Sequence, residues 1–162
     1  MRVLVVLGEG GHTRQMVRLL DQLGPIYEYH YLIATEDVLS EGKIHIPGPV
    51  HRIRRPRTKK EGRTDPAPLA AWHTLHSFVQ IIPIVMHVRP QAVLANGPSV
   101  AVPAALLGKL FGARLIWVET ASRVDNLTAS ARIAYRWADL FFVQWPQLQQ
   151  RYPKAIYAGR LL

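Results

Sequence analysis

A run of glycines near the start of the chain has the residue types and spacing of a phosphate-binding loop. The segment Gly8-Glu9-Gly10-Gly11-His12-Thr13 follows an apolar stretch at 3–7 that indicates a buried strand, and residues of helical spacing come after it. Glycines between a parallel strand and a helix let backbone N–H groups approach a ligand, and the helix end adds a partial positive charge. We therefore predict that Gly8, Gly10, Gly11 and Thr13 bind a phosphate or diphosphate.

This loop departs from two common nucleotide-binding motifs. No Gly-Lys-Ser/Thr closes it, as an NTPase loop requires, and Thr13 stands where a dinucleotide fingerprint has its third glycine. An NAD-type oxidoreductase stays an alternative, with Glu36 as the ribose ligand. A tight turn without a ligand is another, in which His12 and Thr13 only cap the helix.

Three further expected strands end in loops of the same character. They lead into Asn96-Gly97-Pro98, into the segment from Glu119 to Arg123, and into Gln144-Trp145-Pro146. Because parallel strands end at one edge of a sheet, we expect these loops and the glycine loop to line one crevice.

One carboxylate in this set suits acid–base chemistry. Glu119 could act as a general base beside an acceptor hydroxyl, and Arg123 could contact a phosphate with two hydrogen bonds. The alternative is a salt bridge between Glu119 and Arg123, which lie four residues apart.

The elements that must position these residues alternate between strands and helices. Strands are expected at 3–7, 29–35, 50–53, 91–95, 114–118, 140–143 and 156–157, with helices between most of them and a polar loop at 54–68. This alternation predicts an α/β fold, a Rossmann-like parallel sheet with helices on both faces. The length of 162 residues suits a single domain over 1–162.

Composition restricts the partners. The chain has no cysteine, which excludes disulfides and thiolate metal sites, and nothing in it requires a metal or another cofactor. Its net charge of +9 favours an anionic partner. Aromatic residues do not alternate with the basic run at 52–63, so we expect no nucleic acid as partner, although the charge keeps a nucleic-acid binder as an alternative.

An uncharged segment follows the basic run. Residues 67–88 are long enough to span a bilayer, which takes about 20 residues. Three histidines and other polar side chains make the segment too polar for lipid on all sides, and Pro83 interrupts it. We expect a helix at 69–88 that lies along a membrane surface or packs against the sheet.

The motifs in their order resemble those of the Alg fourteen-like oligosaccharide biosynthesis proteins, whose members are the membrane-side subunits of a two-protein UDP-N-acetylglucosamine transferase; bacterial PssD-type proteins are relatives. The matching segments are Gly8 to Thr13 with G-S-G-G-H-T, Pro56-Arg57-Thr58-Lys59 with P-R-S-R, Asn96-Gly97-Pro98 with N-G-P, Glu119 to Val124 with E-S-x-x-R-V, and Val143-Gln144-Trp145-Pro146 with V-Q-W-P. The chain departs from the pattern at Glu9, which would repel a diphosphate unless it meets a cation.

The resemblance implies the N-terminal, acceptor-side half of a GT-B glycosyltransferase. This half would help to move a sugar from a UDP-sugar to a polyprenyl-pyrophosphate-linked sugar, and it would be inactive alone. The implied partner is a separate donor-binding subunit, Alg thirteen-like or PssE-type. The implied place is the cytoplasmic face of a membrane, as a peripheral protein.

The same resemblance suggests roles for individual residues. His12 or Glu119 would take the proton of the acceptor hydroxyl, while the glycine loop holds the pyrophosphate. The remaining residues fall into three sets: Asn96, Gly97, Pro98, Arg123 and Gln144 for the substrate; Arg54, Arg55, Arg57, Lys59 and Lys60 for the membrane surface; and Trp145, Tyr157, Leu161 and Leu162 for the partner. The alternative is a scaffold without catalytic residues, which only recruits an active partner to the membrane.

Overall fold

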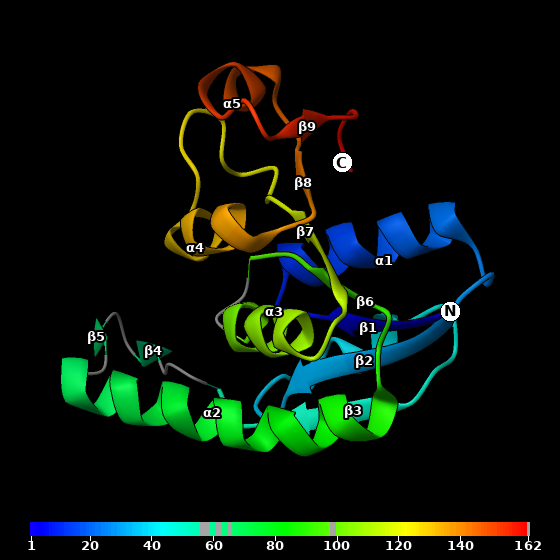
Figure 1. Ribbon diagram of the computed structural model, residues 1–162, viewed down its shortest axis with the longest axis vertical. Helices are drawn as coiled ribbons and strands as arrows, with labels where there is room; N and C mark the ends of the chain where they lie inside the picture. Colours follow the sequence, from blue (N-terminus) through cyan, green and yellow to red (C-terminus); the bar gives the residue numbers. More distant parts are fainter. Residues whose placement is uncertain (56–58, 61–62, 65, 98–99, 162) are drawn as a thin grey trace.

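A seven-stranded parallel sheet forms the centre of the molecule (Figure 1). The computed structural model describes residues 1–55, 59–60, 63–64, 66–97 and 100–161. The strands of this sheet are β1 (Arg2–Val6), β2 (Glu28–Ala34), β3 (Val50–Ile53), β6 (Ala92–Ala95), β7 (Arg114–Val118), β8 (Leu140–Val143) and β9 (Ile156–Tyr157). Every neighbouring pair is parallel, which confirms the predicted Rossmann-like architecture.

In the described part of the chain, five α-helices and a short 3-10 turn connect the strands. They are α1 (Gly11–Leu23), η1 (Glu41–Lys43), α2 (Ala67–Val88), α3 (Ala101–Leu110), α4 (Ala129–Trp137) and α5 (Pro146–Arg151). The segment expected as a polar loop contains two short antiparallel strands, β4 (Lys59–Lys60) and β5 (Arg63–Thr64). The helix expected from residue 69 begins at Ala67, because Pro66 and Pro68 suit a helix start.

The strands are apolar on both sides because helices cover both faces of the sheet. On one face, Met16 and Leu20 of α1 pack against β1 and β2. On the other face, α2 and α3 bury Ile81, Val85 and Ala104 against the same strands and their neighbours. Figure 1 shows α1 on one side of the sheet and α2 and α3 on the other.

The strand order β3-β2-β1-β6-β7-β8-β9 creates a switch point at the middle of the sheet. The chain first builds outward from β1 to β3. It then returns through α2 to β6 and builds outward on the other side. In open α/β sheets the loops diverge at such a point and ligands bind beyond the carboxyl ends of the central strands, so the expected crevice belongs beyond β1 and β6. Within the described part of the chain, no helix, α2 included, combines the length and apolarity needed to cross a bilayer.

Candidate functional site

The glycine loop leaves β1 at this switch point and leads directly into α1. Gly10 precedes the helix with φ 62°, a left-handed backbone that glycine adopts without strain. Among the residues that the structure describes, no side chain caps the helix. Within the described part of the chain, the N–H groups of Gly10, Gly11 and His12 donate to no protein acceptor. A helix start with open N–H groups is the arrangement that binds phosphate groups.

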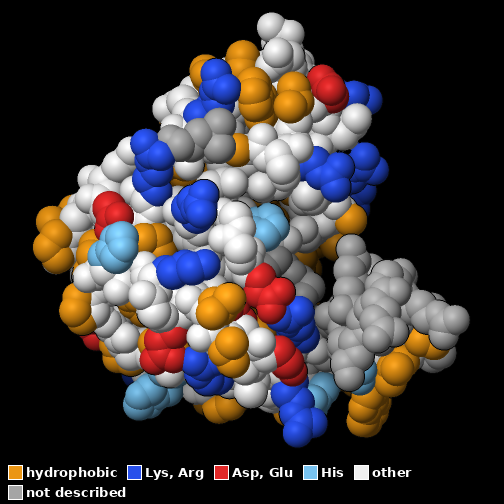
Figure 2. Space-filling model, turned by 180° about the vertical axis from the view of Figure 1, so that it is seen from behind, with side chains coloured by type: hydrophobic (Ala, Val, Ile, Leu, Met, Phe, Trp, Pro, Cys, Tyr) orange, Lys and Arg blue, Asp and Glu red, His pale blue; other side chains and the backbone are white. Residues whose placement is uncertain are grey.

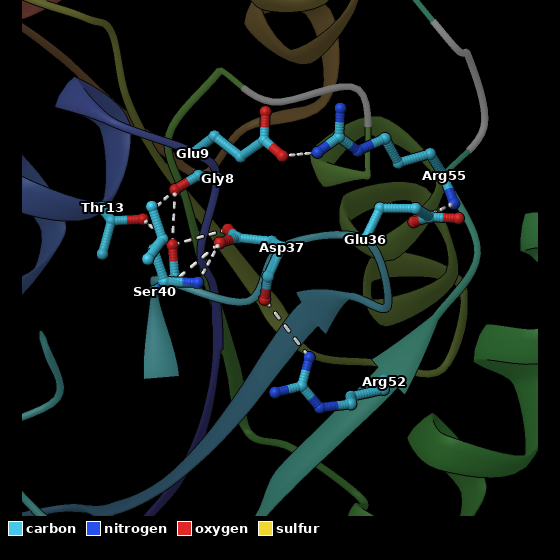
Figure 3. A network of polar contacts seen from close by, with 9 residues as sticks. Gly8, Glu9, Thr13, Glu36, Asp37, Ser40, Arg52 and Arg55 are labelled. Carbon is cyan, nitrogen blue, oxygen red and sulfur yellow. Dashed lines mark hydrogen bonds and ion pairs between the residues drawn. The ribbon is translucent and has the colours of Figure 1, made fainter. Parts of the chain in front are cut away.

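A buried polar cluster supports the loop from behind (Figure 3). The Thr13 hydroxyl donates to the Gly8 carbonyl and lies 2.6 Å from the Ser40 hydroxyl. Ser40 in turn donates to the Asp37 carboxylate at 2.5 Å. Gly8 and Thr13 are both buried, so the structure places these two expected ligands in the support of the loop and leaves Gly10 and Gly11 at its surface.

The carboxylate of Glu9 meets a cation from the basic segment. Arg55 forms an ion pair with Glu9, and its backbone N–H donates to Glu36 at 3.3 Å (Figure 3). The Arg55 side chain is 23% exposed and that of Glu9 53% exposed. Arg55, expected at a membrane surface, therefore neutralises the one acidic side chain of the glycine loop.

His12 bridges the two strands at the switch point. Its Nδ1 lies 2.8 Å from Oδ1 of Asn96, which is buried at the end of β6. Gly97 has φ 56°, and a Cβ added there would lie 2.8 Å from His12 Cε1. Both residues were expected to touch substrate: Asn96 hydrogen-bonds the imidazole, and the missing side chain at Gly97 leaves room for its ring.

A second buried polar group lies beneath His12, and sequence reasoning missed its central member. Gln15 Oε1 accepts from the N–H of Ala121 at 3.2 Å and from Gln144 Nε2 at 2.7 Å. Asn96 Nδ2 is 3.4 Å from the same oxygen. Gln144 is 2% exposed, so its amide lies in this network. In the sequence, Gln15 is a polar residue close to the apolar positions of a helix. That pattern is equally typical of a surface residue, so it did not indicate a buried amide.

Glu119 is fully buried at the end of β7. Thr128 N–H donates to its Oε1 at 3.1 Å, and Trp117 Nε1 donates to its Oε2 at 3.2 Å. Burial raises the pKa of the Glu119 carboxyl, while the hydrogen bonds from Thr128 and Trp117 and the nearby His12 oppose that rise. Arg123, the expected salt-bridge partner of Glu119, has an exposed side chain. The hydrogen bonds to the Glu119 carboxylate come from Thr128 and Trp117 instead.

The residues expected to contact a partner lie near the carboxyl end of β8. Trp145 Nε1 donates to the Ala121 carbonyl at 2.7 Å, and the Arg160 guanidinium lies 4.4 Å from the centre of its ring. Tyr157 is 38% exposed on the edge strand β9. Leu161 lines an apolar groove of about 520 Å³ between α1 and the strands β6 to β8. Leu162 lies outside the described residues.

The expected membrane-facing residues adjoin an exposed apolar stripe on α2. Trp72, Leu75, Val79 and Met86 are each more than half exposed and recur at helical spacing. Arg54 lines a hollow with Trp72 beside the helix. Arg57 and Pro98 lie outside the described residues, and only the backbone of Lys59 and Lys60 is described. Figure 2 views the molecule from behind relative to Figure 1, and Lys and Arg side chains are spread over the face that it shows.

Similarity to known proteins agrees with this arrangement. The family described as "Oligosaccharide biosynthesis protein Alg14 like" matches residues 3–161. The UDP-N-acetylglucosamine transferase subunit ALG14 of Homo sapiens is 35% identical over 184 aligned residues, which cover 100% of this chain and 83% of that protein.

Solved structures share the fold at low identity. MurG of Acinetobacter baumannii superposes with a TM-score of 0.68 at 19% identity, over 90% of this chain and 41% of the MurG chain. A UDP-GlcNAc 2-epimerase from Neisseria meningitidis, bound to UDP-GlcNAc, gives 0.69 at 15% identity, over 99% of this chain and 47% of that one. This chain thus spans less than half of either. Its sheet corresponds to the N-terminal half of GT-B glycosyltransferases, a fold that also serves epimerases and so does not define the reaction. The match over almost the whole sequence, together with the glycine loop and His12 at the switch point, shows that the chain belongs to the Alg14-like family of oligosaccharide biosynthesis proteins.

Proposed function

We propose that this chain is the acceptor-side subunit of a heteromeric, inverting glycosyltransferase. It would help to move N-acetylglucosamine from a UDP-sugar to a sugar linked to a polyprenyl diphosphate. The names of its relatives, UDP-N-acetylglucosamine transferase subunits, support the donor and the need for a second subunit. The proposed partner is an Alg thirteen-like or PssE-type protein that binds the UDP-sugar, and the chain 1–162 acts as one domain.

One observation carries this proposal: the open N–H groups of the glycine loop lie beside the His12 imidazole at the switch point. The N–H groups and the helix end would hold the diphosphate of the acceptor, with each charge–dipole contact contributing roughly 0.3–1 kcal/mol. Arg55 supports anion binding because it neutralises Glu9.

The reaction follows from these positions. The acceptor hydroxyl oxygen attacks the anomeric carbon of the UDP-sugar and forms the new glycosidic bond. Its proton passes to Nε2 of His12, and the broken sugar–phosphate bond leaves its electron pair on UDP. His12 is half-buried at the crevice whereas Glu119 is enclosed, which favours His12 over Glu119 as the proton acceptor. Glu119 would stabilise the imidazolium through its charge.

Membrane attachment is part of the same proposal. The exposed stripe of α2 would enter the headgroup region while Arg54 and neighbouring basic residues contact anionic lipids. This attachment would place the chain as a peripheral protein at the cytoplasmic face, with the crevice near the lipid-linked acceptor.

The test is a transfer assay with the partner, a lipid-linked acceptor and labelled UDP-sugars. Loss of a general base lowers rates by about 10²–10⁴, so we expect a fall of that size for His12→Ala. His45→Ala is the matched control, because His45 is an exposed histidine that pairs with Asp21. Normal transfer by His12→Ala would contradict the catalytic role.

A second variant tests the loop. A Cβ added at the exposed Gly11 would meet no atom of the described residues within 4 Å, so we expect Gly11→Trp to fold and its indole to cover the N–H groups. We expect it to raise the KM for the acceptor strongly.

The exposed apolar stripe of α2 also supports the alternative of a scaffold, because it could recruit a partner to the membrane without any catalytic residue. If the chain only recruits the partner, the partner alone should transfer sugar to soluble acceptor analogues at the full rate. The proposal expects no such transfer without this chain.

A further inference from the structure

We propose that Gln15 is a positioning residue that fixes the proton of His12 on Nδ1 and leaves Nε2 as the proton acceptor. The catalytic meaning rests on the proposed function of His12. The hydrogen-bond directions themselves follow from the groups that contact Gln15, Gln144 and Asn96.

The orientation of the Gln15 amide is set by a backbone group. The N–H of Ala121 can only donate, and it lies 3.2 Å from Gln15 Oε1. An NH₂ group in that position would face another donor. The side chain is 8% exposed, so water has little access to replace the lost bond.

The orientation of the Gln144 amide is set by two other backbone groups. The Leu161 N–H donates to Gln144 Oε1 at 2.8 Å. The Glu119 carbonyl oxygen, which can only accept, lies 3.0 Å from Gln144 Nε2. The same nitrogen donates to Gln15 Oε1 at 2.7 Å. Two independent sets of backbone contacts therefore agree that the oxygen of the Gln15 amide, and not its NH₂ group, faces Ala121 and Gln144.

Asn96 transmits this orientation to His12. Its Nδ2 faces Gln15 Oε1 at 3.4 Å, which turns Oδ1 toward His12 Nδ1 at 2.8 Å. Since Oδ1 can only accept, Nδ1 must carry the hydrogen. A neutral imidazole has one N–H, so its Nε2 keeps a lone pair.

Burial makes this chain of amides directional. Asn96 and Gln144 are 1% and 2% exposed. Reversing the Gln144 amide would bury its NH₂ against the Leu161 N–H, and reversing the Asn96 amide would bury its Oδ1 against the Gln15 oxygen, which is also an acceptor. The three side chains come from α1 and from the loops after β6 and β8. The far end is the Leu161 N–H, in the segment beside the apolar groove.

The experiment reads the position of the His12 proton directly. Long-range ¹⁵N–¹H correlation spectra of the labelled full chain, recorded where His12 is neutral, distinguish the two tautomers. We expect Nδ1–H in the wild type. Gln15→Met removes the amide oxygen, so we expect a mixture of tautomers. Gln15→Glu keeps acceptor oxygens and should keep Nδ1–H.

Activity with the partner gives the second readout. Gln15→Met should lower kcat by about tenfold to a hundredfold, less than the loss of the base itself, and leave the KM for the lipid acceptor unchanged. Gln150→Met, at an exposed glutamine of α5, should change neither tautomer nor kcat.

Three results would overturn the inference: an Nε2–H tautomer in the wild type, an unchanged tautomer in Gln15→Met, or loss of Nδ1–H in Gln15→Glu. The first and third decide the matter even where Gln15→Met does not fold. Failure of the proposed function looks different, because His12→Ala would then transfer sugar normally while the wild type still shows Nδ1–H.

Discussion

At the scale of single residues, the site depends on how a few polar atoms are paired. The glycine loop presents N–H groups on one side, and the cluster of Thr13, Ser40 and Asp37 ties down its other side. Arg55 offsets the charge of Glu9. This ion pair removes the repulsion that Glu9 would exert on the diphosphate that we propose the loop binds.

Gly97 is the residue where a single methyl group should disturb the site. Gly97→Ala adds a Cβ 2.8 Å from His12 Cε1 at a backbone φ of 56°. We expect the imidazole to be displaced, with transfer reduced at least tenfold and stability lowered by about 1 kcal/mol. The same change at Gly42, where an added Cβ would meet no atom of the described residues within 4 Å, should leave both unchanged. Steady-state kinetics and urea denaturation measure the two effects.

The Glu9–Arg55 pair should control affinity for the diphosphate. Arg55→Ala leaves the Glu9 charge beside the loop, so we expect the Kd of the acceptor to rise about fivefold, the effect of roughly 1 kcal/mol for an exposed pair. Calorimetric titration with a diphosphate analogue measures it.

A double variant separates this cause from a general loss of positive charge. Glu9→Gln combined with Arg55→Ala should restore most of the affinity. Lys154→Ala, which removes one positive charge from an exposed site near β9, should have little effect. Equal weakening by all three changes would contradict the pairing argument.

The sequence indicates which residues belong to the candidate site, but it does not indicate which atoms each of them contacts. The motif residues Asn96 and Gln144 were expected to touch substrate, and the structure shows that their amides connect to Gln15 and His12. Spacing along a chain cannot orient an amide. Gln15 and Ser40 escaped attention because a lone polar residue in a helix or loop is also typical of a surface.

At the scale of elements, α2 has two faces with different roles. Ile81 and Val85 belong to the core, whereas Trp72, Leu75, Val79 and Met86 face solvent. An unpaired apolar stripe of this kind beside arginines is typical of helices that lie at a membrane interface.

The stripe yields a direct prediction. Trp72→Glu combined with Leu75→Glu should weaken co-sedimentation with anionic vesicles at least tenfold without lowering the melting temperature, because neither side chain is in the core. Ile133→Glu, at an exposed apolar residue of α4, is the control and should bind as the wild type does. Vesicle binding that survives the double change would contradict a membrane role for α2.

The edge between β2 and β3 should make stability depend on pH. The His30 and His51 rings are stacked with centres 5.5 Å apart, and Glu28 lies 3.2 Å from His30. Burial lowers the pKa of His51 below 6.5, and His30 and His87 lower it further. The unfolded chain thus binds the proton more readily, so stability falls as the pH drops below that value.

Urea unfolding at about pH 7.5 and pH 5.5 measures this dependence. His51→Gln should flatten the loss of stability on acidification. His45→Gln, at an exposed histidine outside the cluster, should preserve it. An unchanged pH dependence in His51→Gln would show that other groups dominate.

The elements themselves were largely predictable. The strands at 50–53, 114–118 and 140–143 have the predicted bounds. At 114–118 and 140–143, a short and mostly apolar run between polar or glycine residues leaves little choice of boundary. The pair β4 and β5 was not predicted, since Lys59-Lys60 and Arg63-Thr64 carry no apolar alternation and pair through backbone groups.

At the scale of the whole molecule, the order of the strands determines where the site can be. The central switch point brings the loops after β1 and β6 together, and the loops after β7 and β8 reach them through Gln15. The sheet face carrying α1 also keeps an apolar groove beside Leu161. The crevice and the groove both involve the loop after β8, so partner binding near the groove would be adjacent to the proposed chemistry.

The most direct test of the central claim is an NMR titration of the labelled chain with a short-chain polyprenyl-diphosphate-linked sugar. The account predicts that the amide signals of Gly10, Gly11 and His12 shift together and saturate, and that Gly11→Trp abolishes these shifts. Saturable binding of the same compound that leaves these three signals unmoved would contradict it.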